Sequence, residues 1–435
     1  MKTYKTYNQD QMNLIPQSWE DCLRPNHMAL IVNDIIEEID INEIQQAYEA
    51  ELRGFPPYHP KMMLKILIYG YCIGVRSSRK ISKRCEDDIG FRYLSGNNFP
   101  KFRAIADFRQ RHLAAFHKLF VNVLVLCRET GLVKLGHVSL DGTKFKANAS
   151  KHKAMSYERM QQEEAKLSQE IAAMIAEAER IDKSEDKQYG KNKRGDEIPK
   201  DLQRKDARLI KIRKAKAALE ERAAKEKKKK NDDDPPPTPG GKDQYNFTDP
   251  ESRIMPASDD KKSFIQGYNA QLVVDSKNQI IVANNLCAHP NDQKQLKVVV
   301  PQIKRNLGRN PDELSADAGY FSENSIDYLR DEEKIAPYIP PDRQRHGVQV
   351  KSPRGPLPEN MSVADSMRRF LSTKRGRKQY ALRKITVEPV NGQIKNCMGF
   401  RQFSLRGLNN CQGEFDLVCL CHNILKLYRY RANPT

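Results

Sequence analysis

The chain has 435 residues, 30% of them charged, and Lys and Arg outnumber Asp and Glu to give a net charge of +19. This length predicts two or three domains, and the basic excess favours a polyanion partner, with nucleic acid as the first candidate. No apolar run approaches the length of a membrane span, which argues against a membrane protein. Nine cysteines without a regular framework, and no signal peptide, predict a reducing cytoplasm rather than a disulfide-rich secreted fold.

Residues 1–130 are predicted to be helical. A strongly apolar stretch after His59 predicts a helix with Pro60 in its first turn, and residues 80–93 predict another, with Ser78 as N-cap. A further helix from Pro100 carries an apolar stripe and, on its other face, the cations Arg103, Arg109 and Arg111. Two short helices around a turn fit a helix-turn-helix reader of DNA, and an ordinary helical bundle with a solvated basic face fits as well.

Residues 132–140 predict a short apolar strand that ends at Asp141-Gly142. A carboxylate at a strand end lies at the rim of a sheet, where a cation can approach. Mg²⁺ prefers oxygen ligands and is usually held by one or two carboxylates together with substrate phosphates. Asp-Gly is also a common turn dipeptide, so Asp141 becomes informative only if other acids converge on it.

Residues 151–244 predict a helical hairpin insertion followed by a charged, proline-rich linker. Within it, residues 155–226 are very polar and carry two narrow apolar seams, which predicts few buried residues. The first seam includes Met160, Leu167, Ile171 and Ile175, and the second includes Leu202, Leu209, Ile210, Ile212 and Leu219. Strands resume after the linker, so this segment interrupts a core.

The resumed elements alternate between strand and helix. Residues 264–275 and 279–288 predict a hairpin, Asn291-Asp292 predicts a helix start, and a short strand ends at Asp317 beside a glycine. Ser322 is expected to cap the next helix, and residues 335–339 predict one more strand. This is the element order of a ribonuclease-H-like mixed sheet in an α/β fold, in which ligands from neighbouring parallel strands meet at one end of the sheet.

A third acid follows a basic run. Residues 368–384 contain eight Arg or Lys and no acid, and they include Arg375, Arg377 and Lys378. Glu388 is an isolated acid just after this run, and Lys395 lies two helical turns further on. The two side chains therefore share a helical face, which fits either a common site or a structural ion pair.

At these residues the chain resembles the DDE transposases of bacterial insertion sequences, in the branch with a helical N-terminal domain. The resemblance covers nearly the whole chain, from Tyr58-His59-Pro60 and Phe108-Arg109 onward. It is carried by four motifs: DGT at 141–143, NAQ at 269–271, SADAGYFS at 315–322 and VEPVNGQIK at 387–395. Together these motifs are specific, although each alone would be weak.

The resemblance implies an Asp-Asp-Glu triad of Asp141, Asp317 and Glu388. The family's Tyr-Arg-Glu-Lys signature falls on Tyr380, Arg383, Glu388 and Lys395, with an Arg-to-Glu gap one residue longer than in its best-known form. Some relatives place their large insertion shortly before the glutamate, whereas here it follows the first aspartate. Contacts made by that insertion in those relatives therefore do not transfer to this chain.

The implied chemistry is metal-dependent hydrolysis of a phosphodiester at each element end, followed by strand transfer into target DNA. Two Mg²⁺ ions about 4 Å apart, or Mn²⁺ in their place, would be bridged by Asp141, with one each held by Asp317 and Glu388. Arg383 and Lys395 suit phosphate contacts. Tyr380 would contact a displaced nucleotide or be a packed aromatic.

The implied organisation is a DNA-binding helical domain (1–130), the first part of the catalytic core (131–150), the insertion (151–244) and the rest of the core with C-terminal helices (245–435). The 368–384 run would track phosphates at the cut site, while the N-terminal cations hold the element end. The expected partners are double-stranded DNA of element ends and target, with a homodimer or higher assembly on DNA in the bacterial nucleoid. The alternatives are a catalytically silent DNA-binding protein derived from a transposase, a Mg²⁺-dependent nuclease that does not transpose, and a structural helical protein.

Overall fold

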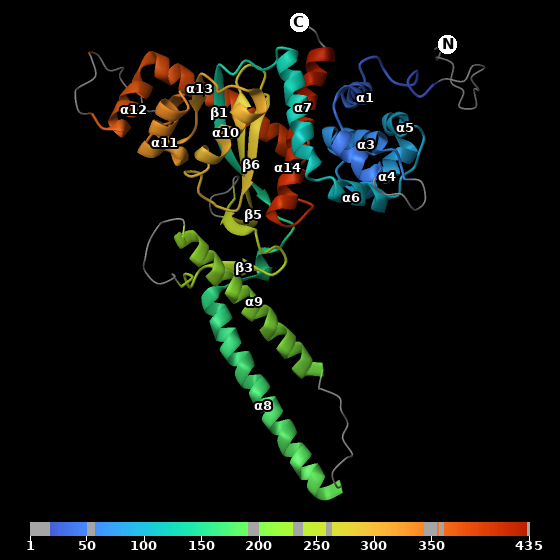
Figure 1. Cartoon of the computed structure of the whole chain (residues 1–435), viewed down its shortest axis with the longest axis vertical. Helices are drawn as coiled ribbons and strands as arrows, with labels where there is room; N and C mark the ends of the chain where they lie inside the picture. Colours follow the sequence, from blue (N-terminus) through green and yellow to red (C-terminus); the bar gives the residue numbers. More distant parts are fainter. Residues whose placement is uncertain are drawn as a thin grey trace, which may run out of the picture. The chain divides into compact units, whose positions relative to one another are not determined.

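The computed structural model describes residues 18–49, 57–189, 200–228, 238–257, 263–342, 355 and 361–432. The chain divides into two compact units: Met1–Phe145 with Asn269–Thr435 form the first unit, and Lys146–Tyr268 form the second unit. Figure 1 traces their helices and strands. Within the described ranges, no helix combines the length and apolar character needed to cross a bilayer. The nine cysteines all fall in these ranges, and each is a free thiol.

The N-terminal part of the first unit is helical. Its elements are α1 (Met28–Glu38), α2 (Asn42–Glu49), α3 (Pro60–Cys72), α4 (Ser78–Asp87), α5 (Ile89–Ser95), α6 (Phe102–Arg111) and α7 (Ala115–Glu129). Ten of the 13 residues of α3 are buried, so α3 is a central helix against which its neighbours pack. Pro60 lies in the first turn of α3, as predicted, and the His59 ring accepts a hydrogen bond from the Lys61 N–H.

The helix predicted for residues 80–93 is in fact two helices. Asp88 has an extended backbone (φ −110°, ψ 125°) that ends α4, and its carboxylate accepts the Phe91 N–H at 3.2 Å to cap α5. The residue preceding α4 is Ser77 rather than Ser78, and its side chain makes no cap bond. The helix predicted from Pro100 begins at Phe102. A capping aspartate inside an otherwise helical pattern thus divides one predicted helix into two.

A mixed sheet forms the core of the first unit. Its strand order is β4-β5-β1-β7-β8, with β6 also paired to β5. The strands are β1 (His137–Lys146), β4 (Arg253–Pro256), β5 (Phe264–Asp275), β6 (Ile281–Cys287), β7 (Glu313–Ser315) and β8 (Ala336–Tyr338). β4 pairs with the part of β5 that precedes Asn269 and belongs with it to the second unit. β1, β7 and β8 are parallel, whereas β5 and β6 are antiparallel.

The first strand differs from the prediction. It does not end at Asp141-Gly142 but continues through both residues to Lys146. The reason lies beyond the Asp-Gly pair, where Thr143 and Phe145 alternate with more exposed residues and are themselves buried. The Phe145 ring packs 5.2 Å from Phe400 and 5.7 Å from Phe415, centroid to centroid. This burial overrides the turn signal, so Asp141 projects from within a strand.

The remaining helices of the first unit are α10 (Leu296–Leu307), α11 (Glu323–Asp327), α12 (Val363–Ser372), α13 (Lys374–Gly392) and α14 (Leu408–Ala432). Ser322 caps α11 by accepting the Ser325 N–H at 3.1 Å, as predicted. α14 is buried over most of its length and runs beside α7 (Figure 1).

The outer edge of β6 is closed by side-chain amides. Asn423 of α14 accepts the Ile281 N–H and donates to the Ile281 carbonyl, both at 2.9 Å. Gln412 of the same helix accepts the Leu286 N–H at 2.6 Å. These bonds occupy backbone groups that an edge strand would otherwise offer to another chain.

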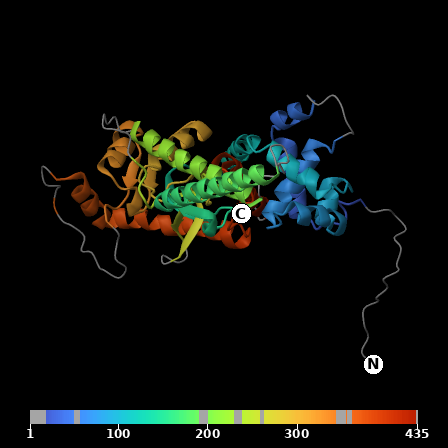
Figure 2. The ribbon, with the colours of Figure 1, turned by 90° about the horizontal axis from the view of Figure 1, so that it is seen from below.

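The second unit is built on a helical hairpin. α8 (Tyr157–Tyr189) and α9 (Lys200–Lys228) lie side by side (Figures 1 and 2), and η1 (Lys151–Lys153), β2 (Ala154–Ser156) and β3 (Gln244–Asn246) accompany them. β2 and β3 form their own two-stranded sheet. The predicted seams meet in one small cluster that includes Met160, Leu167, Leu209 and Ile212. Ile175 and Ile210, both assigned to these seams from the sequence, are instead 45% exposed and do not belong to this cluster.

The fold is therefore the predicted one: a mixed α/β core of ribonuclease-H-like organisation, with a helical N-terminal region and a long helical insertion after the first strand.

Candidate active site

Two of the three predicted acids are brought to the same edge of the sheet by strand register. Ser139 of β1 pairs with Ser315 of β7 in the parallel ladder. Asp141 and Asp317 each follow their paired serine by two residues, so they leave the ladder at the same level on neighbouring strands. Asp317 is fixed by the first turn after β7, where its carboxylate accepts the Gly319 N–H at 2.8 Å.

Asp141 is the most enclosed of the three predicted acids, with a side chain that is 18% exposed. Its carboxylate accepts hydrogen bonds from Asn391 Nδ2 at 3.2 Å and from the Arg383 guanidinium at 3.4 Å. Burial raises the pKa of Asp141 to about 7; Arg383 opposes the rise, and the charges of Asp317 and Asp292 add to it. The surroundings of Asp141 thus disfavour its charged form, mainly because the group is buried.

Arg383 lies among the acids. Its side chain projects from α13, is 15% exposed and forms an ion pair with Asp141. Burial disfavours its charge, but the pKa of Arg383 still lies above its ordinary value because Asp141, Tyr380, Asp317 and Glu388 surround it with negative or polar groups. The guanidinium therefore supplies the positive charge that this group of acids needs.

The structure adds an acid that the sequence analysis did not select. Asp292 Oδ1 accepts hydrogen bonds from Asn269 Nδ2 at 2.7 Å and Gln271 Nε2 at 2.8 Å. The Oε1 atom of Gln271 in turn accepts the buried Tyr320 hydroxyl. Both amides come from the NAQ motif of β5, so the motif serves to hold Asp292.

Gly142 explains how Asp292 comes so close to the first strand. A Cβ placed on Gly142 would lie 2.6 Å from Asp292 Oδ1, so only glycine leaves room for that carboxylate. From the sequence, Asn291-Asp292 was predicted to start a helix, but α10 begins at Leu296. Asp292 lies in the preceding loop and faces the sheet edge instead of capping the helix. The available signal was the pair of amides in NAQ, which require an acceptor when buried.

The other residues of the signature differ in their surroundings. Glu388 is exposed on α13, and its charge contributes to the raised pKa of Arg383. Tyr380 is half-buried and hydrogen-bonded to Arg383; burial raises its pKa. Lys395 lies beyond α13, in the tighter segment η4 (Gln393–Cys397), with its Nζ 5.4 Å above the Phe145 ring. Its ammonium group is thus placed against an aromatic face as a cation–π contact.

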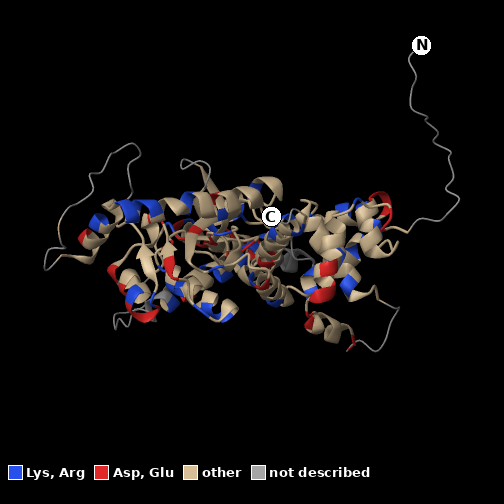
Figure 3. Cartoon of the chain, turned by 90° about the horizontal axis from the view of Figure 1, so that it is seen from above, with Lys and Arg blue, Asp and Glu red and all other residues tan. Residues whose placement is uncertain are grey.

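The predicted DNA-contacting cations are not equivalent. Arg377 and Lys378 are exposed on α13, where Lys and Arg are frequent (Figure 3), while the exposed Arg375 lies 3.5 Å from Glu313. Arg103 and Arg111 are exposed on α6. Arg109 is different: it is 8% exposed and donates to the Tyr71 hydroxyl at 3.0 Å and the Arg76 carbonyl at 3.3 Å. Its predicted place on an exposed basic face is wrong, because the polar groups inside the bundle hold its guanidinium.

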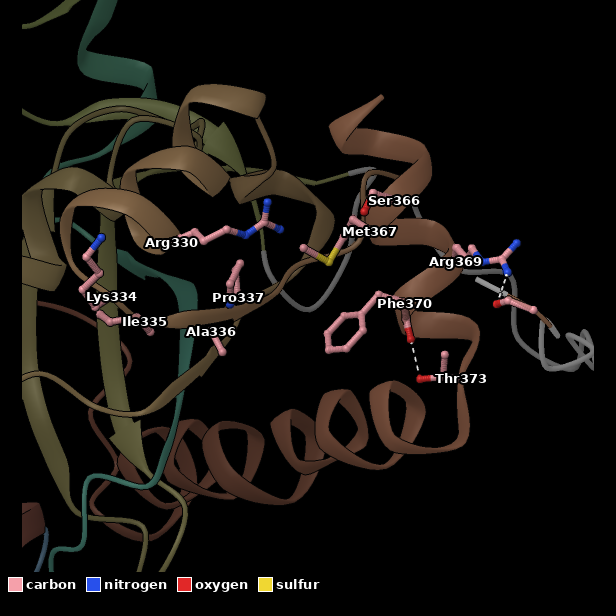
Figure 4. Close-up of a pocket in the computed structure, with 11 residues that line it drawn as sticks. Arg330, Lys334, Ile335, Ala336, Pro337, Ser366, Met367, Arg369, Phe370 and Thr373 are labelled. Carbon is pink, nitrogen blue, oxygen red and sulfur yellow. Dashed lines mark hydrogen bonds between the residues drawn. The ribbon is translucent and has the colours of Figure 1, made fainter. Parts of the chain in front are cut away.

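The acids lie neither in a ready metal-binding group nor in the cavity beside β8. Among the described residues, no group of three or more His, Cys, Asp or Glu side chains is arranged to hold a metal ion. A cavity of about 790 Å³ lies between β8 and α12, lined by residues that include Arg330, Pro337 and Phe370 (Figure 4). None of the predicted acids lines it, so this hollow is separate from the group around Asp141.

Comparison with protein families gives two matches. Residues 17–111 match a transposase domain (DUF772), and residues 206–424, half of the chain, match the transposase DDE domain. The second match includes Asp292, Asp317 and Glu388, whereas Asp141 lies in neither matched range. Searches of curated proteins and of solved structures find no match. With half of its length matched by that model, the chain belongs to the transposase DDE domain family.

Proposed function

We propose that this protein binds the ends of an insertion sequence and performs metal-dependent phosphodiester hydrolysis and strand transfer of DNA. One observation carries the proposal: Asp141 and Asp317 lie at the same level just past the end of the ladder between β1 and β7, and α13, which bears Glu388, contacts Asp141 through Arg383 and Asn391. Membership of the DDE transposase family supports the reaction class. The net charge of +19 supports DNA as the partner.

The residue types around Asp141 suit a divalent cation, although they do not form a metal-binding group in the arrangement that the structure describes. The group offers carboxylate oxygens from Asp141, Asp317 and Glu388, which are the ligands that Mg²⁺ prefers. Two buried amide oxygens nearby, Asn269 Oδ1 and Asn391 Oδ1, have no hydrogen-bond partner. A buried carboxyl with a raised pKa gains from an added positive charge. Asp141, Asp317 and Glu388 would hold Mg²⁺ or Mn²⁺, which supplies an activated water and charge stabilisation at phosphorus.

The protein's own residues then have separate tasks. Asn391 orients the Asp141 carboxylate from α13, and Gly142 leaves space for Asp292 beside it. Arg383 neutralises the acids in the arrangement described here, and it has to leave Asp141 before the acids can hold a cation. Once displaced, its guanidinium is suited to bind a DNA phosphate next to the scissile bond, because its planar fork matches two phosphate oxygens.

The reaction consists of two in-line displacements at phosphorus. In the first, a water oxygen forms a bond to phosphorus and the DNA 3′-oxygen leaves and takes up a proton. In the second, the oxygen of that 3′-hydroxyl loses its proton and forms a bond to the phosphorus of a target phosphodiester, and the displaced 3′-oxygen of the target takes up a proton. Arg377 and Lys378 on α13 are placed before Glu388 in the chain and would contact the DNA backbone near the cut. Arg103 and Arg111 of α6 would contact the element end at a distance.

Asp141→Asn tests the proposal. The substrate is a labelled duplex carrying the inverted repeat found beside the gene, incubated with Mg²⁺ or Mn²⁺. We expect cleavage to be abolished while binding of the duplex is kept, because affinity comes from contacts between cations and phosphate. Asp331→Asn, at an exposed acid, is the matched control and should cleave normally. Cleavage by purified Asp141→Asn at the wild-type rate would refute the metal role of this residue.

A catalytically silent DNA-binding protein is the second candidate. The ion pair between Arg383 and Asp141 is the observation that favours it, since this contact keeps a cation of the protein itself where a metal would bind. The same assay separates the two candidates. A wild-type protein that binds its own ends and cuts neither strand with either ion would be the silent protein.

A further inference from the structure

A second polar cavity of the first unit has not been used by the proposed reaction. It measures about 860 Å³ and lies where the loop before β1, the β5–β6 turn, α13 and α14 meet. Its walls are formed by Thr130, Gly131, Leu132, Ser276, Lys277, Asn278, Gln279, Ile385, Lys426, Arg429 and Tyr430. None of the triad acids is among them, so this cavity is distinct from the group around Asp141.

The charge in this cavity has one sign. Lys277, Lys426 and Arg429 line it, and no lining residue is acidic. Two acids adjoin lining residues in the sequence: Glu129, which precedes Thr130 and is exposed, and Asp275, which precedes Ser276. Asp275 is buried, and its two oxygens accept the backbone N–H groups of Lys277, Leu135 and Lys134. The Asp275 carboxylate is therefore committed to the turn. The Lys277 ammonium donates to the Gly131 carbonyl at 2.7 Å, so it too has an uncharged partner, and none of the three lining cations has an acidic partner among the lining residues.

Lys426 is held at high electrostatic cost. Its Nζ donates to Gln279 Oε1 at 2.7 Å, an uncharged partner. Burial, together with the neighbouring charge of Arg429, lowers the pKa of Lys426 to about 8. An anion beside Lys426 and Arg429 would remove this penalty by pairing with both charges.

Gln279 closes the β5–β6 turn in a left-handed conformation. Its φ is +59°, in the left-handed region that non-glycine residues seldom adopt. Glycine or asparagine would fit such a turn position with less strain. The glutamine side chain, however, bridges two helices: Nε2 donates to the Ile385 carbonyl of α13 at 2.9 Å, and Oε1 accepts from Lys426 of α14. The bridge gives the Ile385 carbonyl a donor that Pro389, four residues on, does not have, and it fixes Gln279 Oε1 at the Lys426 ammonium.

The rim of the cavity indicates what kind of anion it suits. Ile385 is 64% exposed and Tyr430 is 41% exposed, so apolar surface borders the cations. Inorganic phosphate gains no contact energy from apolar surface, whereas the deoxyribose and bases of a nucleic acid pack on it. Ile385 also precedes Glu388 by three residues on α13, an axial rise of about 4.5 Å. A DNA strand at the proposed cut site is therefore within a few nucleotides of this cavity.

We propose that the cavity of Lys277, Lys426 and Arg429 binds a phosphodiester group of DNA and anchors the duplex beside the cut site. This inference rests on the proposed function for the identity of the polyanion. It assigns the C-terminal helix α14 a direct contact with DNA. Because the contact is made to the backbone, it should not depend on base sequence.

The test uses full-length protein carrying Asp141→Asn, so that binding is measured without cutting. Lys426→Gln with Arg429→Gln is compared with Lys304→Gln and Arg330→Gln, two exposed cations that change the net charge equally. Affinity for an element-end duplex and a random duplex is measured as a function of salt. We expect about a tenfold loss on both duplexes, and a salt slope lower by about one unit, for the cavity variant only. Equal losses for the two variants would overturn the inference.

Three further readouts keep the outcome clear. Gln279→Asn retains every charge and tolerates the left-handed conformation, but its side chain is too short for the bridge. We therefore expect a smaller loss of DNA affinity than in the double variant. This variant keeps the test informative even if the double variant folds poorly. If inorganic phosphate raises the melting temperature of the parent but not of the cavity variant, while DNA affinities stay equal, the ligand is a free anion and the DNA contact is wrong. If the wild-type protein never cleaves DNA, the proposed function is refuted. If the cavity variant nevertheless binds DNA more weakly than its parent, this inference stands.

Discussion

Gly142→Ala is the most direct perturbation of the arrangement around Asp141. The added Cβ would lie 2.6 Å from Asp292 Oδ1 and 2.9 Å from Gln271 Nε2, so it would displace the carboxylate and the amide that holds it. Replacing glycine within a strand normally stabilises a protein by about 0.5–1 kcal/mol. Overpacking a filled site costs about 1–3 kcal/mol. The cost of the overlap exceeds the gain from replacing glycine, so we expect a net loss of roughly 1–2 kcal/mol in the free energy of unfolding.

The effect on cleavage should be larger than the effect on stability. Relieving a contact of 2.6 Å requires a movement approaching 1 Å next to Asp141. A misplacement of about 1 Å at a reacting centre can lower the rate by about 100-fold. We therefore expect Gly142→Ala to bind the element-end duplex like wild type and to cleave it about 100-fold more slowly in a single-turnover assay.

Gly136→Ala is the matched control. It lies just before the same strand, and its added Cβ would have its nearest neighbour, Asp312 Oδ2, at 4.0 Å. It should melt and cleave like wild type. Adding Asp292→Ser to Gly142→Ala should recover part of the lost melting temperature, because it removes the closest overlap while the one with Gln271 Nε2 remains. If Gly142→Ala itself cleaves at the wild-type rate, the close approach of Asp292 to β1 has no part in the reaction and the reasoning fails.

Three further predictions concern the fold around the site. Arg109→Met should lower the free energy of unfolding by about 1–3 kcal/mol, because it leaves the Tyr71 hydroxyl and Arg76 carbonyl without their donor. It should not alter the salt dependence of DNA binding. Arg103→Gln, at an exposed residue, should instead reduce that salt dependence and leave the free energy of unfolding unchanged. Asn423→Ala should cost about 2 kcal/mol or more in urea unfolding by exposing both backbone groups of Ile281, and equal stability would show that water replaces the amide. Burial lowers the pKa of His422 to about 3 from its ordinary value near 6.5, so between these two pH values the unfolded state binds a proton that the folded state does not. The free energy of unfolding should therefore fall by about 1.4 kcal/mol for each pH unit between about 6.5 and about 3. His422→Gln should flatten this pH dependence.

The order of strands and helices along the chain was predictable because several local signals agree. The alternation in residues 264–275 and 279–288, the apolar residues before Asp141 and the cap at Ser322 each match what the chain does. These signals arise from burial on one face of a sheet or helix, which a sequence records directly. The hairpin of the second unit was predictable for the opposite reason, since its seams are too narrow to join a larger core.

The arrangement of side chains around Asp141 was only partly predictable. Asp317 could be placed with Asp141 because parallel strands fix the relation, but Asp292 could not, since a loop residue has no periodicity and its position depends on amides more than 20 residues away in the sequence. The prediction that Arg109 is exposed was wrong for a related reason. On a helical wheel it belongs with Arg103 and Arg111, and only the packing of α3 against α6 brings the Tyr71 hydroxyl to it. Long-range polar contacts leave little trace in one sequence.

Arg383 joins these observations into one physical requirement. Asp141, Asp317 and Asp292 cannot share one edge of the sheet as anions without positive charge, and the Arg383 guanidinium is the cation found there. Because α13 also carries Glu388, the helix that brings the third acid brings its counter-charge as well. Any divalent cation would have to compete with this guanidinium, so its affinity should rise when a DNA phosphate draws Arg383 away. Tight metal binding should therefore depend on DNA. A DNA-independent metal affinity, unchanged by Arg383→Gln and measured by calorimetry on the full-length protein, would exclude this coupling.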